Sequence, residues 1–146
     1  MNSDATKVGI GIFMEKKAII KRIEQVLSGL EVDLGYVFGS FLVSDDFRDV
    51  DVAVLTPEKL GPYERFRFPI QVARKLEDEI KPKHEFDVKI LDSSPIDFQY
   101  NVISSSELVF CKDEYGRIGY EEAAMREYLD YMETSMWLDE RFLAEA

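Results

Sequence analysis

The sequence that decides the fold is LGYVFGSFLVSDDFRDVDVAVL, residues 34–55. Its first part, residues 34–38, is short and apolar, and its last part, residues 50–55, is rich in valine, so both are typical of buried strands. Ten residues that are not strand-like, Gly39 to Arg48, lie between them. That spacing is short for a crossover helix and long for a tight hairpin, which favours a functional loop.

Two aspartates open the second of these strands. In an extended chain residues i and i+2 point to the same face, so Asp49 and Asp51 project side by side. Adjacent carboxylates in an apolar strand repel each other and are costly to desolvate, which makes sense if a divalent cation lies between them. Hard oxygen ligands suit Mg²⁺ or Mn²⁺ better than zinc. Asp87 lies in an alternating strand predicted over residues 85–91, so three carboxylates from two strands could hold two metal ions about 3.5–4 Å apart.

Gly39 and Ser40 directly follow the first strand and offer what a triphosphate needs. Glycine lets the backbone approach the phosphates, and exposed N–H groups with a hydroxyl donate hydrogen bonds to them. Each motif also has a simpler explanation, because a Gly-Ser pair after a strand is usually a turn and an Asp-x-Asp strand end is often only solvated. Their ordered combination with Asp87 favours a functional site.

Helical periodicity predicts two helices around these strands. The first covers residues 15–28, and the second runs from Tyr63 to Ile80, with either Pro57 or Pro62 suited to its first turn. The apolar stripe of the first helix contains Ala18, Ile19, Ile23, Val26 and Leu27, and that of the second contains Phe66, Ile70, Ala73, Leu76 and Ile80.

The last third of the sequence predicts a short helix, a strand and a long helix. Ser94 and Pro95 are typical of an N-cap and a first-turn proline, Glu107 to Lys112 favours a strand, and a helix follows from about Tyr120 to the end. The whole order predicts one α/β domain over residues 1–146, with a core at about 15–112 and a C-terminal helix at about 120–146.

Composition excludes several classes of function. The 146 residues are 46% hydrophobic and 32% charged, with a formal net charge of −11, so binding to duplex nucleic acid is unlikely. One cysteine and one histidine permit neither an internal disulfide nor a Cys/His zinc set. Because no targeting segment or run of about 20 apolar residues is visible, we expect a cytoplasmic protein without membrane contact.

The C-terminal helix carries more large apolar side chains than one stripe against a small sheet requires. A role in the core alone is the alternative, but aromatic residues and methionines are enriched at interfaces, so we expect a homo-oligomer or a complex with a second protein that is basic where it touches the helix. The side chains concerned are Tyr120, Met125, Tyr128, Tyr131, Met132, Met136, Trp137, Leu138, Phe142 and Leu143.

Residues 34–55 resemble the signature of the polymerase-β-like nucleotidyltransferase superfamily, closest to its minimal nucleotidyltransferase (MNT, antitoxin-like) family. Residues 83–114, KHEFDVKILDSSPIDFQYNVISSSELVFCKDE, are similar to that family's third-carboxylate strand, short helix and closing strand. The resemblance implies an α+β fold with a mixed four-stranded sheet backed by helices. It also implies that Asp49 and Asp51 bind both metals, that Asp87 helps to activate the acceptor hydroxyl, and that Gly39 and Ser40 hold the β- and γ-phosphates.

The same resemblance implies an activity and a partner. The protein would transfer a nucleoside monophosphate, AMP by family habit, from ATP or another NTP to a hydroxyl and release pyrophosphate. The acceptor would be a tyrosine of a HEPN-type toxin, which the protein would silence as an antitoxin. The loop from Phe41 to Arg48 is shorter and more acidic than is usual in the family and holds no glycine. A weakly active or inactive protein that acts as an interaction module therefore remains the alternative.

Overall fold

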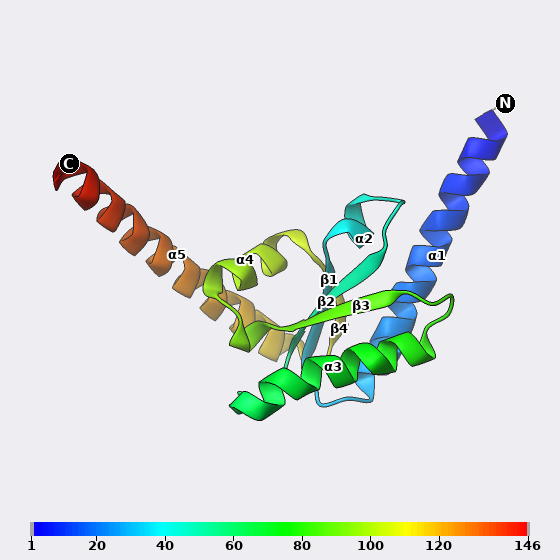
Figure 1. Ribbon diagram of the computed structural model, residues 1–146, viewed down its shortest axis with the longest axis horizontal. Coiled ribbons are helices and arrows are strands. Elements are labelled where there is room, and N and C mark those ends of the chain that lie inside the picture. Colours follow the sequence, from blue (N-terminus) through cyan, green and yellow to red (C-terminus); the bar gives the residue numbers. More distant parts are fainter. Residues whose placement is uncertain (1, 146) are drawn as a thin grey trace.

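The protein is described by a computed structural model that covers residues 2–145 (Figure 1). Helices and strands alternate along these residues, with a 3₁₀ turn at Leu91–Ser93 after the third strand. In chain order they are α1 (Asn2–Ser28), β1 (Leu34–Phe38), α2 (Ser40–Val43), β2 (Asp49–Leu55), α3 (Pro62–Glu79), β3 (Glu85–Ile90), α4 (Ile96–Ser105), β4 (Glu107–Cys111) and α5 (Glu114–Glu145).

The strands form one mixed four-stranded sheet in the order β3-β2-β1-β4. β1 is antiparallel to both β2 and β4, while β2 and β3 are parallel and are connected through α3. The expected fold class, α+β with a mixed four-stranded sheet backed by helices and a long C-terminal helix, is confirmed.

The two faces of the sheet are covered differently. One face carries buried valines of β1 and β2 and packs against the apolar sides of α1 and α3. The other face carries Leu34, Tyr36 and Ala53, which pack with Leu91 and with Val102 of α4. This second cover ends at Phe38, whose ring meets Phe98 of α4 edge-on with centroids 5.6 Å apart. The second face is therefore covered over only part of its length.

Three helix boundaries differ from the sequence prediction. α1 begins at Asn2 instead of residue 15, because a helix already packed over residues 15–28 extends through Gly9 and Gly11 without a new nucleation step. α5 begins at Glu114 instead of about Tyr120. α4 follows Pro95, and Ser94 does not cap it, since the Ser94 hydroxyl donates to the carbonyl of Ile90 instead.

Two of the predicted apolar stripes are only partly buried. In α1 the predicted core residue Ala18 is exposed, while Ile19, Ile23, Val26 and Leu27 are buried. In α3 the face that meets the sheet carries Val72 and Leu76, so Phe66 and Ile70 lie on its flank and are 73% and 42% exposed. No helix among residues 2–145 is long and apolar enough to cross a membrane.

The segment between β1 and β2 contains the short helix α2, which the sequence did not predict. Its Phe41 is buried in the core with 1% exposure, and the Phe41 and Phe47 rings meet edge-on with centroids 4.8 Å apart. The apolar start of the loop therefore anchors the segment to the core.

Replacing Phe41 by alanine should lower the free energy of unfolding by about 3–5 kcal/mol, because a buried aromatic ring is lost and a cavity remains. The change is measured by urea unfolding followed by circular dichroism. Val43→Ala is the matched control, since Val43 is 87% exposed on the same helix and should change stability by less than about 0.5 kcal/mol. Equal effects of the two substitutions would contradict the anchoring role of Phe41.

Candidate functional site

The strand register brings the predicted site residues to one part of the sheet. Phe38, the last residue of β1, lies opposite Asp51 of β2, and Asp51 lies opposite Asp87 of β3. Asp49 precedes Asp51 by two residues on β2 and so shares its face. This is the face that α4 leaves open beyond Phe38, and Asp49 and Asp87 are exposed there while Asp51 is half-buried.

Gly39 is held directly against Asp51. Its φ of 79° and ψ of −155° lie in a region that is open to glycine and strained for other residues. A Cβ atom added to Gly39 would also collide with the carboxylate of Asp51. Both the backbone conformation and the space therefore require glycine at this position.

Ser40 follows as the first residue of α2 and is exposed. The turn is closed by backbone hydrogen bonds, from Leu42 N–H to the Gly39 carbonyl at 3.1 Å and from Ser44 N–H to the Ser40 carbonyl at 2.9 Å. The Gly-Ser pair thus forms a fixed turn beside the carboxylates, as a phosphate-binding segment would require.

The carboxylates on this face repel one another. Partial burial raises the pKa of Asp51, and the charges of Asp87 and then Asp49 raise it further, whereas Lys89 lowers it. Lys89 lies on β3 two residues after Asp87, and its Nζ is 3.6 Å from Asp87 Oδ1, with both side chains 53% exposed. The sequence prediction missed Lys89, although its i+2 spacing from Asp87 in a strand already placed it on the same face.

The three carboxylates have the right chemistry to bind a divalent cation, but their side chains are not positioned around one point. Within residues 2–145, no three His, Cys, Asp or Glu side chains are grouped closely enough to hold a metal ion. Asp49, Asp51 and Asp87 therefore share a face without converging on one point, and Asp87 is paired with Lys89. Carboxylate oxygens are nevertheless the ligands that Mg²⁺ and Mn²⁺ prefer. A bound cation would also relieve the repulsion that disfavours the ionised form of Asp51.

The loop that carries Ser40 is tied to α1 by Lys16. The Lys16 Nζ donates to the carbonyl of Ser44 at 2.7 Å, lies 3.8 Å from Asp45 Oδ1, and sits over the rings of Phe41 and Phe47. Because Lys16 lies far away in the sequence, local motif analysis could not identify it. It positions the loop, and it neutralises part of the loop's own acidic charge.

His84, for which the sequence favoured no catalytic role, packs against the same loop. Its ring lies 5.2 Å from the ring of Phe47, measured between centroids, and its Nε2 is 3.8 Å from Glu15 Oε1. His84 thus contacts the far end of the loop and not the carboxylates of β2.

The fold is the mixed four-stranded sheet expected of a nucleotidyltransferase, and the Gly39 turn and the three aspartates lie at one part of it. Comparison with protein families gives a match over residues 21–115 to the family described as polymerase beta, nucleotidyltransferase. The chain therefore belongs to the polymerase β nucleotidyltransferase family. The matched region contains Gly39, Ser40 and all three aspartates. A comparison with curated protein sequences gives no match.

Solved structures share this fold at low sequence identity. A chain in the complex of a tri-AMPylated Shewanella oneidensis HEPN toxin with its MNT antitoxin is 15% identical, with a TM-score of 0.64 over 88% of this chain and 98% of that chain. A chain of the toxin–antitoxin pair MntA–HepT is 16% identical, with a TM-score of 0.63 over 87% and 98%. A toxin–antitoxin structure with AMP-PNP gives 17% identity and a TM-score of 0.64 over 85% and 98%.

Removing the charge of Asp51 should stabilise the metal-free protein. A carboxyl whose pKa is raised by folding contributes most to stability at low pH, and this contribution declines as the pH rises through the folded-state pKa. At neutral pH, Asp51→Asn should therefore raise the melting temperature in EDTA by about 2–4 °C. Mg²⁺ should raise the melting temperature of the wild type and have little effect on the variant.

Differential scanning fluorimetry with and without Mg²⁺ measures both effects. Asp78→Asn is the control, because Asp78 is exposed on α3. A variant at position 51 that melts below the wild type in EDTA would mean that this carboxylate serves a structural hydrogen bond.

Proposed function

We propose that this protein is an enzyme that transfers a nucleoside monophosphate from a nucleoside triphosphate to a hydroxyl group of another protein. The observation that carries the proposal is the close packing of the Gly39 turn on Asp51, next to Asp49 and Asp87. This arrangement would place a phosphate-binding turn and metal-binding carboxylates around the same triphosphate. Membership in the polymerase β nucleotidyltransferase family supports it.

Each residue has a distinct task in the proposed reaction. The turn at Gly39 and Ser40 binds the β- and γ-phosphates, and Asp49, Asp51 and Asp87 hold divalent cations, Mg²⁺ or Mn²⁺. When bound, such a cation neutralises the negative charge of the phosphates. Fixing donor and acceptor in line supplies much of the rate enhancement for phosphoryl chemistry of this kind.

The acceptor oxygen attacks the α-phosphorus, a new O–P bond forms, and the bond from the α-phosphorus to the bridging oxygen breaks. Pyrophosphate leaves with the electron pair of that bond. The proton of the acceptor hydroxyl is taken up at a carboxylate oxygen of Asp87, which helps to activate the acceptor and passes the proton on to solvent.

We further propose that ATP is the donor and that a HEPN-type toxin is the acceptor. They rest on the solved relatives, one of which contains a tri-AMPylated HEPN toxin with an MNT antitoxin and another AMP-PNP. The acceptor group is proposed to be a tyrosine, and the modification would silence the toxin. This chain would then act as the antitoxin of the pair.

The distal half of α5 is the proposed contact surface for such a partner, or for a second copy. The first half of the helix is attached to α4, where Tyr120 donates to Gln99 Oε1 at 2.7 Å and the rings of Tyr128 and Tyr100 stack with centroids 3.8 Å apart. Beyond Tyr128 the helix extends away from the sheet (Figure 1). Its exposed large side chains there are Leu129, Tyr131, Met132, Met136, Trp137, Leu138, Phe142 and Leu143.

Charge favours a heterologous partner over a second copy on this surface. The distal part of α5 carries more acidic than basic residues, and the whole chain has a net charge of −11. Two such helices side by side would repel each other, whereas a basic apolar groove on another protein would complement the helix.

A protein that binds its partner without catalysis is the second candidate function. The loop between Ser40 and Asp49 is short and carries Asp45 and Asp46, both exposed, which opposes the binding of a triphosphate. Because Lys16 offsets part of this charge, we favour the enzyme.

Loss of the metal-binding carboxylates should abolish nucleotide binding and transfer. In calorimetry with ATP and Mg²⁺, the wild type should give a metal-dependent heat that disappears in Asp49→Asn/Asp51→Asn. Transfer of labelled AMP should fall by at least about a hundredfold, since these groups act where charge develops in the transition state. Asp78→Asn should behave as the wild type. No binding by the wild type at millimolar ATP would exclude the enzyme and leave the interaction module.

Trp137→Ala and Phe142→Ala should each weaken partner binding by about 2 kcal/mol, or roughly thirtyfold in Kd, if these side chains are central anchors. Binding is measured by pull-down and by analytical ultracentrifugation. Met14→Ala is the control, because Met14 is 64% exposed but lies on α1. If both variants bind the partner as tightly as the wild type does, the distal half of α5 is not the interface.

A further inference from the structure

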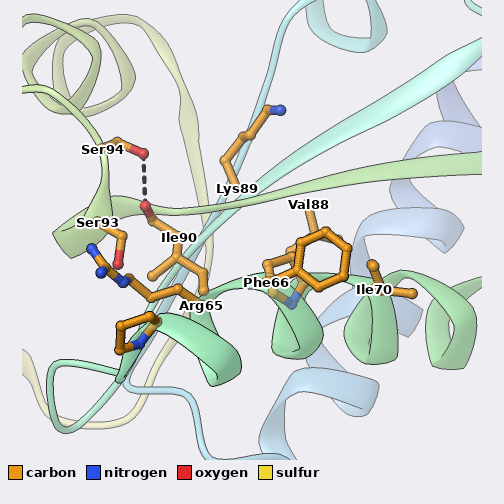
Figure 2. A pocket seen from close by; sticks show the side chains of 10 residues that line it. Arg65, Phe66, Ile70, Val88, Lys89, Ile90, Ser93 and Ser94 are labelled. Carbon is orange, nitrogen blue, oxygen red and sulfur yellow. Dashed lines mark hydrogen bonds between the residues drawn. The ribbon is translucent and has the colours of Figure 1, made fainter.

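A groove runs between α3 and the outer edge of β3 (Figure 2). Its volume is about 580 Å³, and its lining includes Arg65, Phe66 and Ile70 from α3 and Val88, Lys89 and Ser93 from the β3 side. The carboxylate site makes no use of its apolar wall.

On the α3 side, the apolar wall of the groove is formed by side chains that the core leaves out. Phe66 is 73% and Ile70 is 42% exposed, although both repeat at helical spacing on α3. Val88 contributes to the same hollow from β3. Exposed apolar side chains that gather beside a hollow are typical of a binding surface, whereas isolated ones are common on any protein.

The strand that forms the other wall has an open edge. β3 is an outer strand of the sheet and pairs with β2 on one side. At this edge the Phe86 N–H donates to Glu77 Oε1 at 3.2 Å, and beside the groove the Ser94 hydroxyl donates to the Ile90 carbonyl at 2.7 Å. Since backbone groups of alternate residues point to the same side of a strand, those of Val88 also face outward, between these two bonded ends. The edge therefore has room for a short pairing centred on Val88.

The charged residues that line the groove are basic, in a chain whose net charge is −11. Arg65 lies at the α3 wall, and Lys89 stands on the other side of β3 from Phe66 and Ile70 (Figure 2). An occupant with acidic side chains would be attracted to Arg65 and Lys89, whereas the net charge of the whole chain opposes its approach.

We propose that this groove binds an extended, acidic segment of the acceptor protein and thereby delivers the acceptor hydroxyl to Asp87. A segment paired with Val88 adds a strand to the sheet, and an apolar side chain on one of its faces fits between Phe66 and Ile70. Side chains on its other face stand beside Asp87 and Lys89, because directly paired residues on adjacent strands have Cβ atoms about 4.5–5.5 Å apart. This inference rests on the proposed transfer to a protein hydroxyl and specifies where that protein docks.

A synthetic peptide tests the groove without the natural acceptor. The probe is a fluorescent heptapeptide with a central tyrosine, a valine on each side of it and two glutamates at each end. Its counterpart has lysines in place of the glutamates. In fluorescence anisotropy the acidic peptide should bind the wild type, and its Kd should rise at least about tenfold in Phe66→Ser/Ile70→Ser. The basic peptide should bind more weakly by a similar factor.

Two further variants separate the groove from general effects on the protein. Tyr115→Ser is the matched control, since Tyr115 is 86% exposed at the start of α5, next to the opposite outer strand, and should bind the acidic peptide as the wild type does. Arg65→Glu tests charge alone and should weaken binding of the acidic peptide. This test remains informative if the double variant fails to fold. On binding, hydrogen exchange of the Val88 amide should slow in the wild type.

Several results would overturn the proposal. They are equal binding of the acidic peptide by the wild type and the groove variants, equal or tighter binding of the basic peptide, and no binding at millimolar acidic peptide. A change in sedimentation of Phe66→Ser/Ile70→Ser without peptide would identify the groove as a contact between copies instead. ATP binding is measured separately by calorimetry. A negative peptide result therefore does not contradict the proposed nucleotide site, and a negative ATP result does not contradict the proposed peptide groove.

Discussion

The contact between the Gly39 backbone and the Asp51 carboxylate is the constraint on which the site depends. It joins the residue after β1 to the third residue of β2, and it leaves no space for a side chain at position 39. The same contact half-buries Asp51 beside two other carboxylates, so its ionised form is disfavoured. The fold thus maintains an unfavourable group of charges at one place on an uncovered sheet face. Repulsion between charges that a surrounding structure holds in place is common where proteins bind ligands.

Local patterns in the sequence were sufficient for the centre of the sheet. β1 and β2 were predicted within one residue, because each is a short apolar run bounded by turn residues, and the i+2 spacing correctly placed Asp49 and Asp51 on one face. The relation of Asp87 to Asp51 was also correct, since both belong to neighbouring strands. The metal-binding and catalytic roles of these residues remain predictions.

Features that depend on tertiary packing could not be predicted from local sequence patterns. The stripe on α3 suggested that Phe66 and Ile70 are buried, but only the position of the sheet decides which flank of the helix is covered. Lys16 supports a loop that lies far along the chain, and Phe41, which the sequence placed in this loop, is part of the core. A single sequence contains the periodicity of a helix but not its rotation against its neighbours.

The position of β3 at the outside of the sheet gives the two ends of the site different mechanical properties. β1 and β2 lie in the middle, each held by strands on both sides, so Asp51 and the end of β1 that leads into Gly39 open only when much of the sheet opens. β3 is held by one strand and by α3, and outer elements of this kind unfold locally at lower free energy than central ones. The phosphate end of the site is consequently rigid, whereas the end that carries Asp87 can adjust its position to whatever segment lies against it.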